Sequence, residues 1–109
     1  MKKEKFDELF EIAKIRFSEE KFEEAKNFLL EYIDHNPTLE AINLLGIIYI
    51  NLNENDNAIL LFRNLIAKKY VDENIYNNMG IAFKKKKNYS SAIECFNSSI
   101  KINKNQGLL

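Results

Sequence analysis

The sequence of 109 residues is poor in the residues that make tight turns or covalent cross-links. It has three glycines and one proline, too few for the many hairpins of an all-β fold, so helices are favoured. A single cysteine, Cys95, excludes an internal disulfide framework and a cysteine-rich metal site. Long apolar runs are also missing. The longest runs only from Leu44 to Ile50 and contains Gly46, too short to span a bilayer.

Charge of one sign is not in excess either. Sixteen Lys and Arg residues balance sixteen Asp and Glu residues, so nothing favours a nucleic acid or an anionic membrane as the partner. The balance is uneven, however: residues 1–40 carry seven basic and eleven acidic side chains, a net −4, whereas residues 73–109 carry six and two, a net +4. Such polarity suits head-to-tail contact or a polarised partner, and drift in surface charge is the plainer alternative.

The first residues do not resemble a targeting signal. Residues 1–5 are charged, but the residues after them are amphipathic, whereas a signal peptide needs an uninterrupted apolar stretch. The sequence therefore predicts a cytoplasmic protein.

The sequence does contain an internal repeat. Residues 39–72 and residues 73–106 align with pairs of similar residues 34 positions apart. A third copy, one residue short of this period, fits residues 6–38. The paired residues are Gly46 with Gly80, Tyr49 with Phe83, Ala58 with Ala92, and Phe62 with Phe96, and the first copy supplies Leu9, Ile12, Ala13, Ala25, Leu29, Tyr32 and Pro37.

Each copy contains two apolar stripes at helical spacing, which predicts two amphipathic helices per copy. The expected helices span about residues 6–18, 22–34, 39–52, 56–68, 73–86 and 90–103. Asn51–Asn55 is a predicted turn, because asparagine tolerates left-handed backbone, and Asp56 and Ser90 are predicted N-caps. Glycine within a helix costs about 1 kcal/mol relative to alanine, so the recurring glycines indicate close helix packing.

This pattern resembles the tetratricopeptide repeat, whose signature places a Leu-Gly pair, aromatics, an alanine and a proline at fixed offsets. The resemblance implies an all-α fold, a right-handed α-solenoid of three helix-turn-helix units. It implies one domain, 1–109, with repeats at about 6–38, 39–72 and 73–106 and a short tail, 107–109. The pentatricopeptide repeat, which reads RNA, is an alternative that the period of 34 disfavours. The chain departs from the signature at Arg16, Asn55, Tyr70 and Lys104.

Residues with catalytic chemistry are scarce and scattered. His35 and Cys95 lie about three helices apart in the expected fold, too far for a catalytic pair. We expect His35 to end a helix, where the dipole favours it, and Cys95 to pack as a small apolar side chain. Lys84–Lys87 is predicted to complement a helix C-terminus rather than to bind nucleic acid. The sequence therefore predicts no enzyme activity, no metal and no cofactor.

The resemblance implies a concave face, lined mainly by the first helix of each repeat, on which a partner binds. Asparagine can both donate to and accept from the backbone of an extended peptide, and some tetratricopeptide proteins use it so. A branch of the family that clamps chaperone carboxylates needs cations that this chain lacks at the matching places. Asparagine is also abundant throughout the chain, and apolar residues such as Ile50 could be core. The candidate peptide-binding residues are Phe10, Lys14, Asn43, Leu44, Ile47, Asn74, Asn77, Asn78 and Ile81.

The function predicted is a protein-interaction module of scaffold or adaptor type that binds a peptide or protein segment in this groove. The alternatives are a homo-oligomer formed through an uncapped C-terminal helix and a small secretion-type chaperone. In the last helix, Ile93, Phe96 and Ile100 are expected to face the first helix of their own repeat. The side that a further repeat would cover is expected to hold Cys95, Ser98, Ser99 and Ile102.

Overall fold

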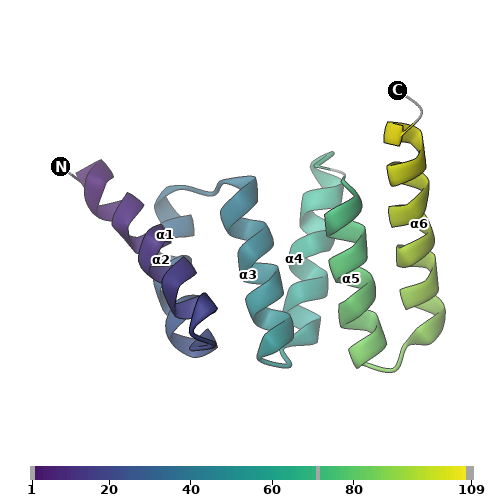
Figure 1. Ribbon diagram of the computed structural model, residues 1–109, viewed down its shortest axis with the longest axis horizontal. Helices are drawn as coiled ribbons and strands as arrows, with labels where there is room; N and C mark the ends of the chain where they lie inside the picture. The colour runs from purple at the N-terminus through teal and green to yellow at the C-terminus, as the bar shows by residue number, and fades with distance from the viewer. Residues whose placement is uncertain (1, 71, 108–109) are drawn as a thin grey trace.

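Six α-helices follow one another along the chain in the computed structural model, which describes residues 2–70 and 72–107, with side chains for 7–70 and 72–104. The described residues contain no strand, so the predicted all-α fold is confirmed. The four middle helices begin and end within one residue of their predicted bounds. The helices are α1 (Lys2–Ser18), α2 (Phe22–His35), α3 (Leu39–Asn51), α4 (Asn55–Ala67), α5 (Glu73–Lys85) and α6 (Tyr89–Gly107) (Figure 1).

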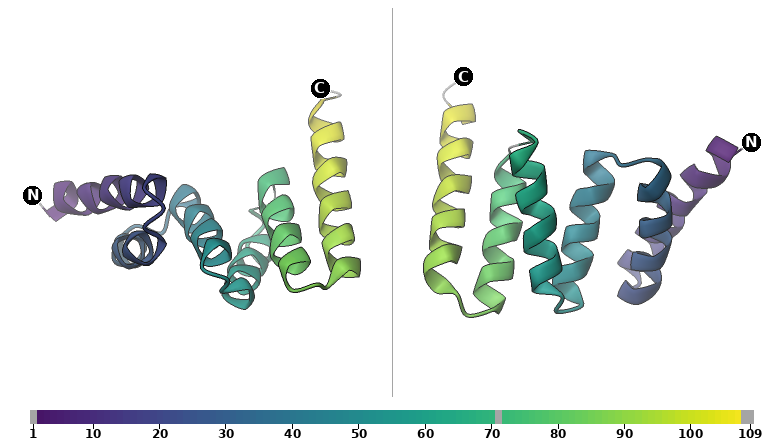
Figure 2. Two further views of the ribbon diagram at one scale, coloured as in Figure 1. Left: turned by 60° about the horizontal axis from the view of Figure 1, so that its bottom comes forward. Right: turned by 180° about the vertical axis from the view of Figure 1, so that it is seen from behind.

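Each helix packs mainly against the next one in the chain. The hairpins α1–α2, α3–α4 and α5–α6 are joined by contacts of α2 with α3 and of α4 with α5, and α3 also touches α5. The helices therefore run in order across an elongated molecule of 44 × 34 × 23 Å, with α1 and α6 at opposite ends (Figures 1 and 2). Contacts of each hairpin with the neighbouring hairpins are the mark of a solenoid.

The core consists of two clusters of buried side chains that meet at α3. One cluster joins α1, α2 and α3 and includes the fully buried Leu29 and Ile48. The other joins the end of α3 with α4, α5 and α6 and includes the fully buried Phe62. Tyr49 of α3 packs against both clusters, so the apolar core is continuous from one hairpin to the next.

Gly46 and Gly80 lie where the two helices of a hairpin approach each other closely. A Cβ atom at Gly46 would lie 2.3 Å from Cζ of Phe62, and one at Gly80 would lie 2.7 Å from Cε1 of Phe96. Real Cβ atoms do not approach other carbons so closely, because interiors are already packed near their limit. The prediction that these glycines serve close packing is confirmed.

The turns inside the three hairpins share one backbone conformation. Glu20, Asn53 and Lys87 have φ values of 61°, 61° and 65°, in the left-handed region that side chains disfavour. The prediction that an asparagine in the second turn takes this conformation is confirmed. The first and third turns have charged residues, Glu20 and Lys87, at the same place, and this backbone conformation is unfavourable for both of them.

Glycine at this turn position is expected to stabilise the fold. For Lys87→Gly we expect the free energy of unfolding to rise by about 0.5–1 kcal/mol. A non-glycine residue in left-handed backbone costs about 1–2 kcal/mol, and glycine removes this cost but loses more backbone entropy on folding, which cancels part of the gain. Urea unfolding followed by circular dichroism measures it. Asn53→Gly is the control, with a smaller gain, because asparagine already tolerates this φ. A loss of stability in Lys87→Gly would show that the turn does not carry this strain.

The predicted N-caps of α4 and α6 are wrong. Asp56 and Ser90 each lie within the first turn, because the helices begin one residue earlier than expected, at Asn55 and Tyr89. Glu54 precedes α4 without a capping side-chain bond, and at the start of α6 the Oδ1 atom of Asn88 accepts a hydrogen bond from the backbone N–H of Ser91 at 3.4 Å.

Side-chain caps of the usual kind begin the helices that open the second and third hairpins. Thr38 Oγ1 accepts from the backbone N–H of Ala41 at 3.2 Å, and Asp72 Oδ1 accepts from that of Ile75 at 2.9 Å. Both side chains sit at the N-cap of their helix, where an oxygen can satisfy an otherwise unbonded helical N–H.

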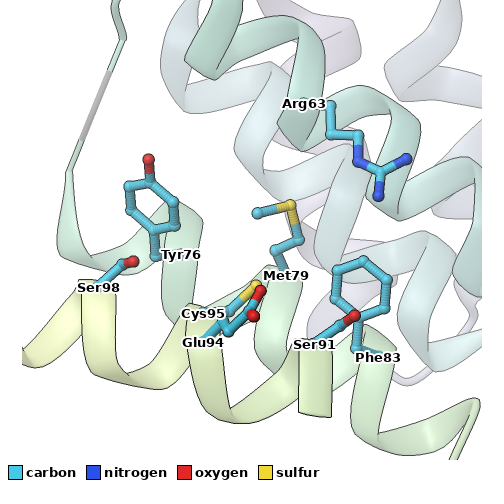
Figure 3. Close-up of a pocket in the computed structure, with 8 residues that line it drawn as sticks. All are labelled: Arg63, Tyr76, Met79, Phe83, Ser91, Glu94, Cys95 and Ser98. Carbon is cyan, nitrogen blue, oxygen red and sulfur yellow. The ribbon is translucent and has the colours of Figure 1, made fainter. Parts of the chain in front are cut away.

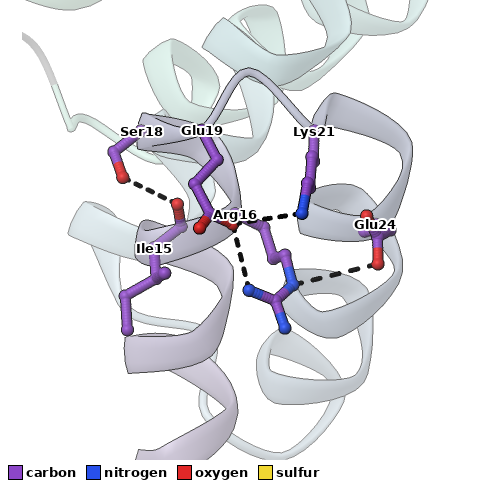
Figure 4. Close-up of polar contacts among 6 residues, drawn as sticks. All are labelled: Ile15, Arg16, Ser18, Glu19, Lys21 and Glu24. Atoms are coloured by element: carbon purple, nitrogen blue, oxygen red, sulfur yellow. Dashed lines mark hydrogen bonds and ion pairs between the residues drawn. The ribbon is translucent and has the colours of Figure 1, made fainter.

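Arg16 takes the place of an aromatic residue at the end of α1 without leaving the hairpin open. Its Nη1 donates to Glu19 Oε1 at 3.0 Å, and its Nε lies 3.8 Å from Glu24 Oε1 (Figure 4). Phe17 and Phe22 meet edge to face with ring centroids 5.7 Å apart. Exposed ion pairs contribute little, so the neighbouring phenylalanines supply most of the packing that the missing aromatic would give.

The expected orientation of α6 is wrong for four of its side chains. Ile93 and Ile100 do not face the first helix of their repeat; they are 58% and 56% exposed. Cys95 is buried instead, and Ser99 Oγ donates to the backbone oxygen of Glu73 at 2.8 Å. Phe96 does face α5, where it meets Gly80.

Candidate functional site

A surface hollow of about 350 Å³ lies between α1 and α3. It exists because these two first helices approach each other less closely than α3 and α5 do. Five of the nine predicted groove residues line it, together with Phe17, which the helical spacing of the sequence also places on this face, and with Glu40, which the prediction left out. The five are Phe10, Lys14, Asn43, Leu44 and Ile47.

The wall of the hollow is apolar and fixed in place. The ring of Phe10 stacks on Tyr32 of α2 with centroids 4.8 Å apart, and only 9% of Phe10 is exposed. Phe10 is thus a core residue with one edge on the hollow, rather than a free groove side chain. Leu44 and Ile47 are half-buried on α3, so they offer apolar surface without being part of the deep core.

The rim carries one fixed cation and one anion. Lys14 Nζ lies 4.6 Å from the centroid of the Phe10 ring and 2.8 Å from Glu11 Oε1. The hydrogen bond to Glu11 raises the pKa of Lys14, so the ammonium stays charged at neutral pH. Glu40 lies on the α3 side. A segment entering the hollow would meet an apolar wall between charges of both signs.

The asparagines of α3 and α5 form a bridge beside the hollow. Asn78 Nδ2 donates to Asn43 Oδ1 at 3.4 Å. The sequence register pairs Asn43 with Asn77, but the structure brings Asn43 to Asn78, and Asn77 and Asn74 are exposed on α5. The bridge uses one polar atom of each amide, so within the described residues Asn43 Nδ2 and Asn78 Oδ1 remain able to bond a ligand.

Two residues farther along this face serve the fold. Ile81 is half-buried and packs against the core cluster of α4, α5 and α6. Lys85 Nζ donates to the backbone oxygen of Ile50 at 2.7 Å, in the last turn of α3, where a cation complements the helix dipole. Ile50 is 7% exposed, so its interpretation as core is confirmed.

The residue of the hollow that the prediction missed, Glu40, was visible in the sequence. Glu40, Asn43, Leu44 and Ile47 follow one another at helical spacing, so any argument that placed Asn43 on this face also placed Glu40 there.

Comparison with known proteins decides the family. The sequence pattern of the tetratricopeptide repeat matches residues 39–67 and again residues 73–106, which are the second and third hairpins. The chain belongs to the tetratricopeptide repeat family. A TPR repeat-containing protein of Methanocaldococcus jannaschii is 32% identical over 66 residues, 60% of this chain and 21% of that protein.

Solved structures share the tetratricopeptide fold. A crystal structure of MamA superposes with a TM-score of 0.84 at 20% identity, covering 95% of this chain and 61% of that one. A second MamA structure gives 0.81 at 20% identity, covering 94% and 56%. The chain thus spans about a fifth of its archaeal relative and under two thirds of the MamA chains. The tetratricopeptide repeat is a protein-interaction scaffold, and at this level the predicted function is confirmed.

A second hollow, of about 240 Å³, opens where the last tetratricopeptide hairpin meets α4. At the edge of this hollow, the Arg63 guanidinium lies 5.7 Å from the centroid of the Phe83 ring. The sulfur atoms of Met79 and Cys95 lie near the centre of the hollow (Figure 3). Burial raises the pKa of the Cys95 thiol, so the thiol stays protonated and weakly nucleophilic at neutral pH. The interpretation of Cys95 as a packing residue is confirmed.

The tetratricopeptide hairpins keep the one histidine and the one cysteine in different helices. His35 ends α2, as predicted, while Cys95 lies in α6. Among the described side chains, those of residues 7–70 and 72–104, there is no group of three His, Cys, Asp or Glu residues placed to hold a metal ion. None of the helices described has the length and hydropathy needed to cross a bilayer.

Proposed function

We propose that the chain is a non-enzymatic adaptor that binds an extended protein segment along the face formed by α1, α3 and α5. One observation carries the proposal: the apolar hollow between α1 and α3 shares Asn43 with the asparagine bridge to α5. An apolar side chain of the segment enters the hollow, and its backbone bonds to the amides of Asn43 and Asn78. Asn74 and Asn77 extend the same polar surface along α5.

The proposal is tested with peptides, because no partner is needed in advance. A library of extended peptides displayed on phage is selected against the immobilised chain, and the affinity of the peptides obtained is measured by calorimetry. We expect Asn43→Ala with Asn78→Ala to weaken binding by about tenfold or more, since each lost neutral hydrogen bond contributes about 1 kcal/mol. Leu44→Ala should weaken binding further through lost apolar contact.

The control is Asn57→Ala, which removes an exposed asparagine from α4 and should leave peptide affinity unchanged. Circular dichroism verifies that each variant keeps its helices. If the Asn43 and Asn78 double variant bound peptides as the parent chain does, while Arg63→Ala lost binding, the site would be the hollow beside α4 and α6 and the proposal would be wrong.

Self-association is a second candidate function, because α6 exposes Tyr89, Ile93 and Ile100 to 57%, 58% and 56%. Large apolar side chains gathered on one helix face are typical of an interaction surface. The cytoplasmic location, the alternative of a secretion-type chaperone, and the exclusion of cofactors and nucleic acid stay predictions from the sequence, as do the repeat bounds.

A further inference from the structure

The exposed isoleucines of α6 repeat a pair that α4 uses inside the molecule. Ile93 and Ile100 lie 34 residues after Ile59 and Ile66. Ile59 is 5% exposed and Ile66 is partly buried, and both pack in the cluster that α4 shares with α5. On α6 the same two positions are 58% and 56% exposed. The face of α6 that carries Ile93 and Ile100 therefore corresponds to the face by which α4 packs against α5. In the part of the chain that the structure describes, no helix covers this face of α6.

At the opposite end of the solenoid, α1 presents a surface that could pack against this face of α6. α3 joins the cluster of α1 and α2 through Ala41 and Ile48, both 0% exposed. The residues 33 positions earlier in α1 are Glu8 and Ile15, and Ile15 is 51% exposed. Ile12, half-buried, lies between them on the same face. The face of α1 that carries Glu8, Ile12 and Ile15 therefore corresponds to the face by which α3 packs against α2, the helix before it.

We propose that the chain associates head to tail, with the Ile93–Ile100 face of α6 packing on the Ile12–Ile15 face of α1 in a second copy. This contact would continue the packing of α4 on α5 from one copy to the next. Figures 1 and 2 show α1 and α6 at opposite ends of the molecule, so one copy can use both faces at once. A contact between two different faces is heterologous and can propagate into an open chain of copies.

Charge favours a second copy of this chain as the occupant. The exposed Asp7, Glu8 and Glu11 lie beside Ile12 on α1, and the exposed Lys101 and Lys104 lie beside Ile100 on α6. The net charges of −4 over residues 1–40 and +4 over residues 73–109 have the same sense. Complementary charge selects this partner and speeds encounter. Two copies of α6 meeting symmetrically would instead bring lysine against lysine.

The proposed contact is independent of peptide binding. The hollow between α1 and α3 uses Phe10, Lys14 and Phe17, and helical spacing places these on the side of α1 opposite to Ile12 and Ile15. Since one helix pair forms the contact, it buries less than the roughly 1,200 Å² of a stable interface. The association is therefore weak, reversible and dependent on concentration and salt.

Two complementary variants test the geometry. Ile15→Glu blocks the α1 face, and Ile93→Glu blocks the α6 face. In sedimentation equilibrium up to about 1 mM protein, where contacts of millimolar affinity become populated, we expect the parent chain to form species larger than dimers. Each variant alone should be monomeric. Their mixture should form a 1:1 dimer and nothing larger, because only one pair of intact faces remains.

Leu60→Glu is the matched control, since Leu60 is 60% exposed on α4 and lies on neither face; it should associate as the parent chain does. Circular dichroism confirms folding, and Ile15→Ser with Ile93→Ser repeats the test without added charge. A parent chain that is monomeric throughout overturns the proposal, and so does a mixture that does not pair. Dimers of Ile15→Glu alone would overturn it in favour of a symmetric contact between two α6 helices. Peptide binding in the groove should be unchanged in both variants, so the two proposals fail separately.

Discussion

Replacing Phe62 by alanine is expected to lower the free energy of unfolding by about 3–5 kcal/mol. The side chain is 0% exposed and is the largest fully buried one among the described residues. It lies at the centre of the middle hairpin, against Gly46, so its removal leaves a cavity that its neighbours cannot easily fill. Domains of this size are stable by only about 5–15 kcal/mol, so the variant keeps little margin. Urea unfolding followed by circular dichroism measures the loss.

Leu60→Ala is the control for Phe62→Ala, because it lies two residues away in the same helix but is 60% exposed. Surface changes of this kind usually alter stability by less than about 0.5 kcal/mol. Since a solenoid is stabilised by neighbour contacts, loss of Phe62 should also uncouple the outer hairpins and broaden the transition. A loss below about 1 kcal/mol for Phe62→Ala would mean that the middle hairpin does not carry the core.

The helices could be predicted because the repeat encodes them twice. Gly46, Ala58 and Phe62 recur as Gly80, Ala92 and Phe96, and a pattern of small and large residues at fixed spacing leaves one way to close a hairpin. The caps escaped prediction for a local reason. Serine and aspartate favour an N-cap in general, but whether a helix begins one residue earlier depends on the turn before it.

The candidate site was harder to predict, because periodicity gives the face of a residue but not the distance between helices. Nothing in the sequence shows that α1 stands farther from α3 than α5 does, which is what opens the hollow. Phe10 was placed on the groove, yet it stacks on Tyr32, because an edge of a large ring can line a surface while the rest is core. The sequence register pairs Asn43 with Asn77, whereas the hydrogen bond joins it to Asn78, because the register of a repeat fixes equivalent positions and not which side chains meet across a helix pair.

The exposure of Ile93 and Ile100 was within reach of the sequence. Their register with Ile59 and Ile66 identifies the face that a following first helix covers, and the burial of Ile59 confirms what covers it inside the molecule. The expectation failed because it assigned Ile93 and Ile100 to their own hairpin. In a repeat, some apolar residues serve the next unit, and the burial of their equivalents tells which.

Gly46→Ala is expected to destabilise the chain by about 2 kcal/mol, although alanine is the better helix former by about 1 kcal/mol. The added Cβ would lie 2.3 Å from Cζ of Phe62, and overpacking a core costs about 1–3 kcal/mol or more. Phe62 is fully buried and cannot swing away. Gly80→Ala is the matched comparison. The added Cβ would lie 2.7 Å from the Phe96 ring, which is farther than at Gly46, and that ring is only partly buried. The free energy of unfolding of Gly80→Ala should therefore be close to that of the parent chain.

The first hairpin indicates how the clash at Gly46 is relieved. At the places of Gly46 and Phe62 it has Ala13 and Leu29, both 0% exposed. There the first helix has an alanine, which is larger than glycine, and the second helix has a leucine, which is smaller than phenylalanine. Phe62→Leu should therefore rescue Gly46→Ala, and the double variant should be more stable than the sum of the single changes by about 1 kcal/mol or more. A double-mutant cycle by urea unfolding measures this coupling. Additive losses would mean that the backbone of α3 moves to accommodate the alanine, and that the pairing of small with large residues does not set the spacing of the hairpin.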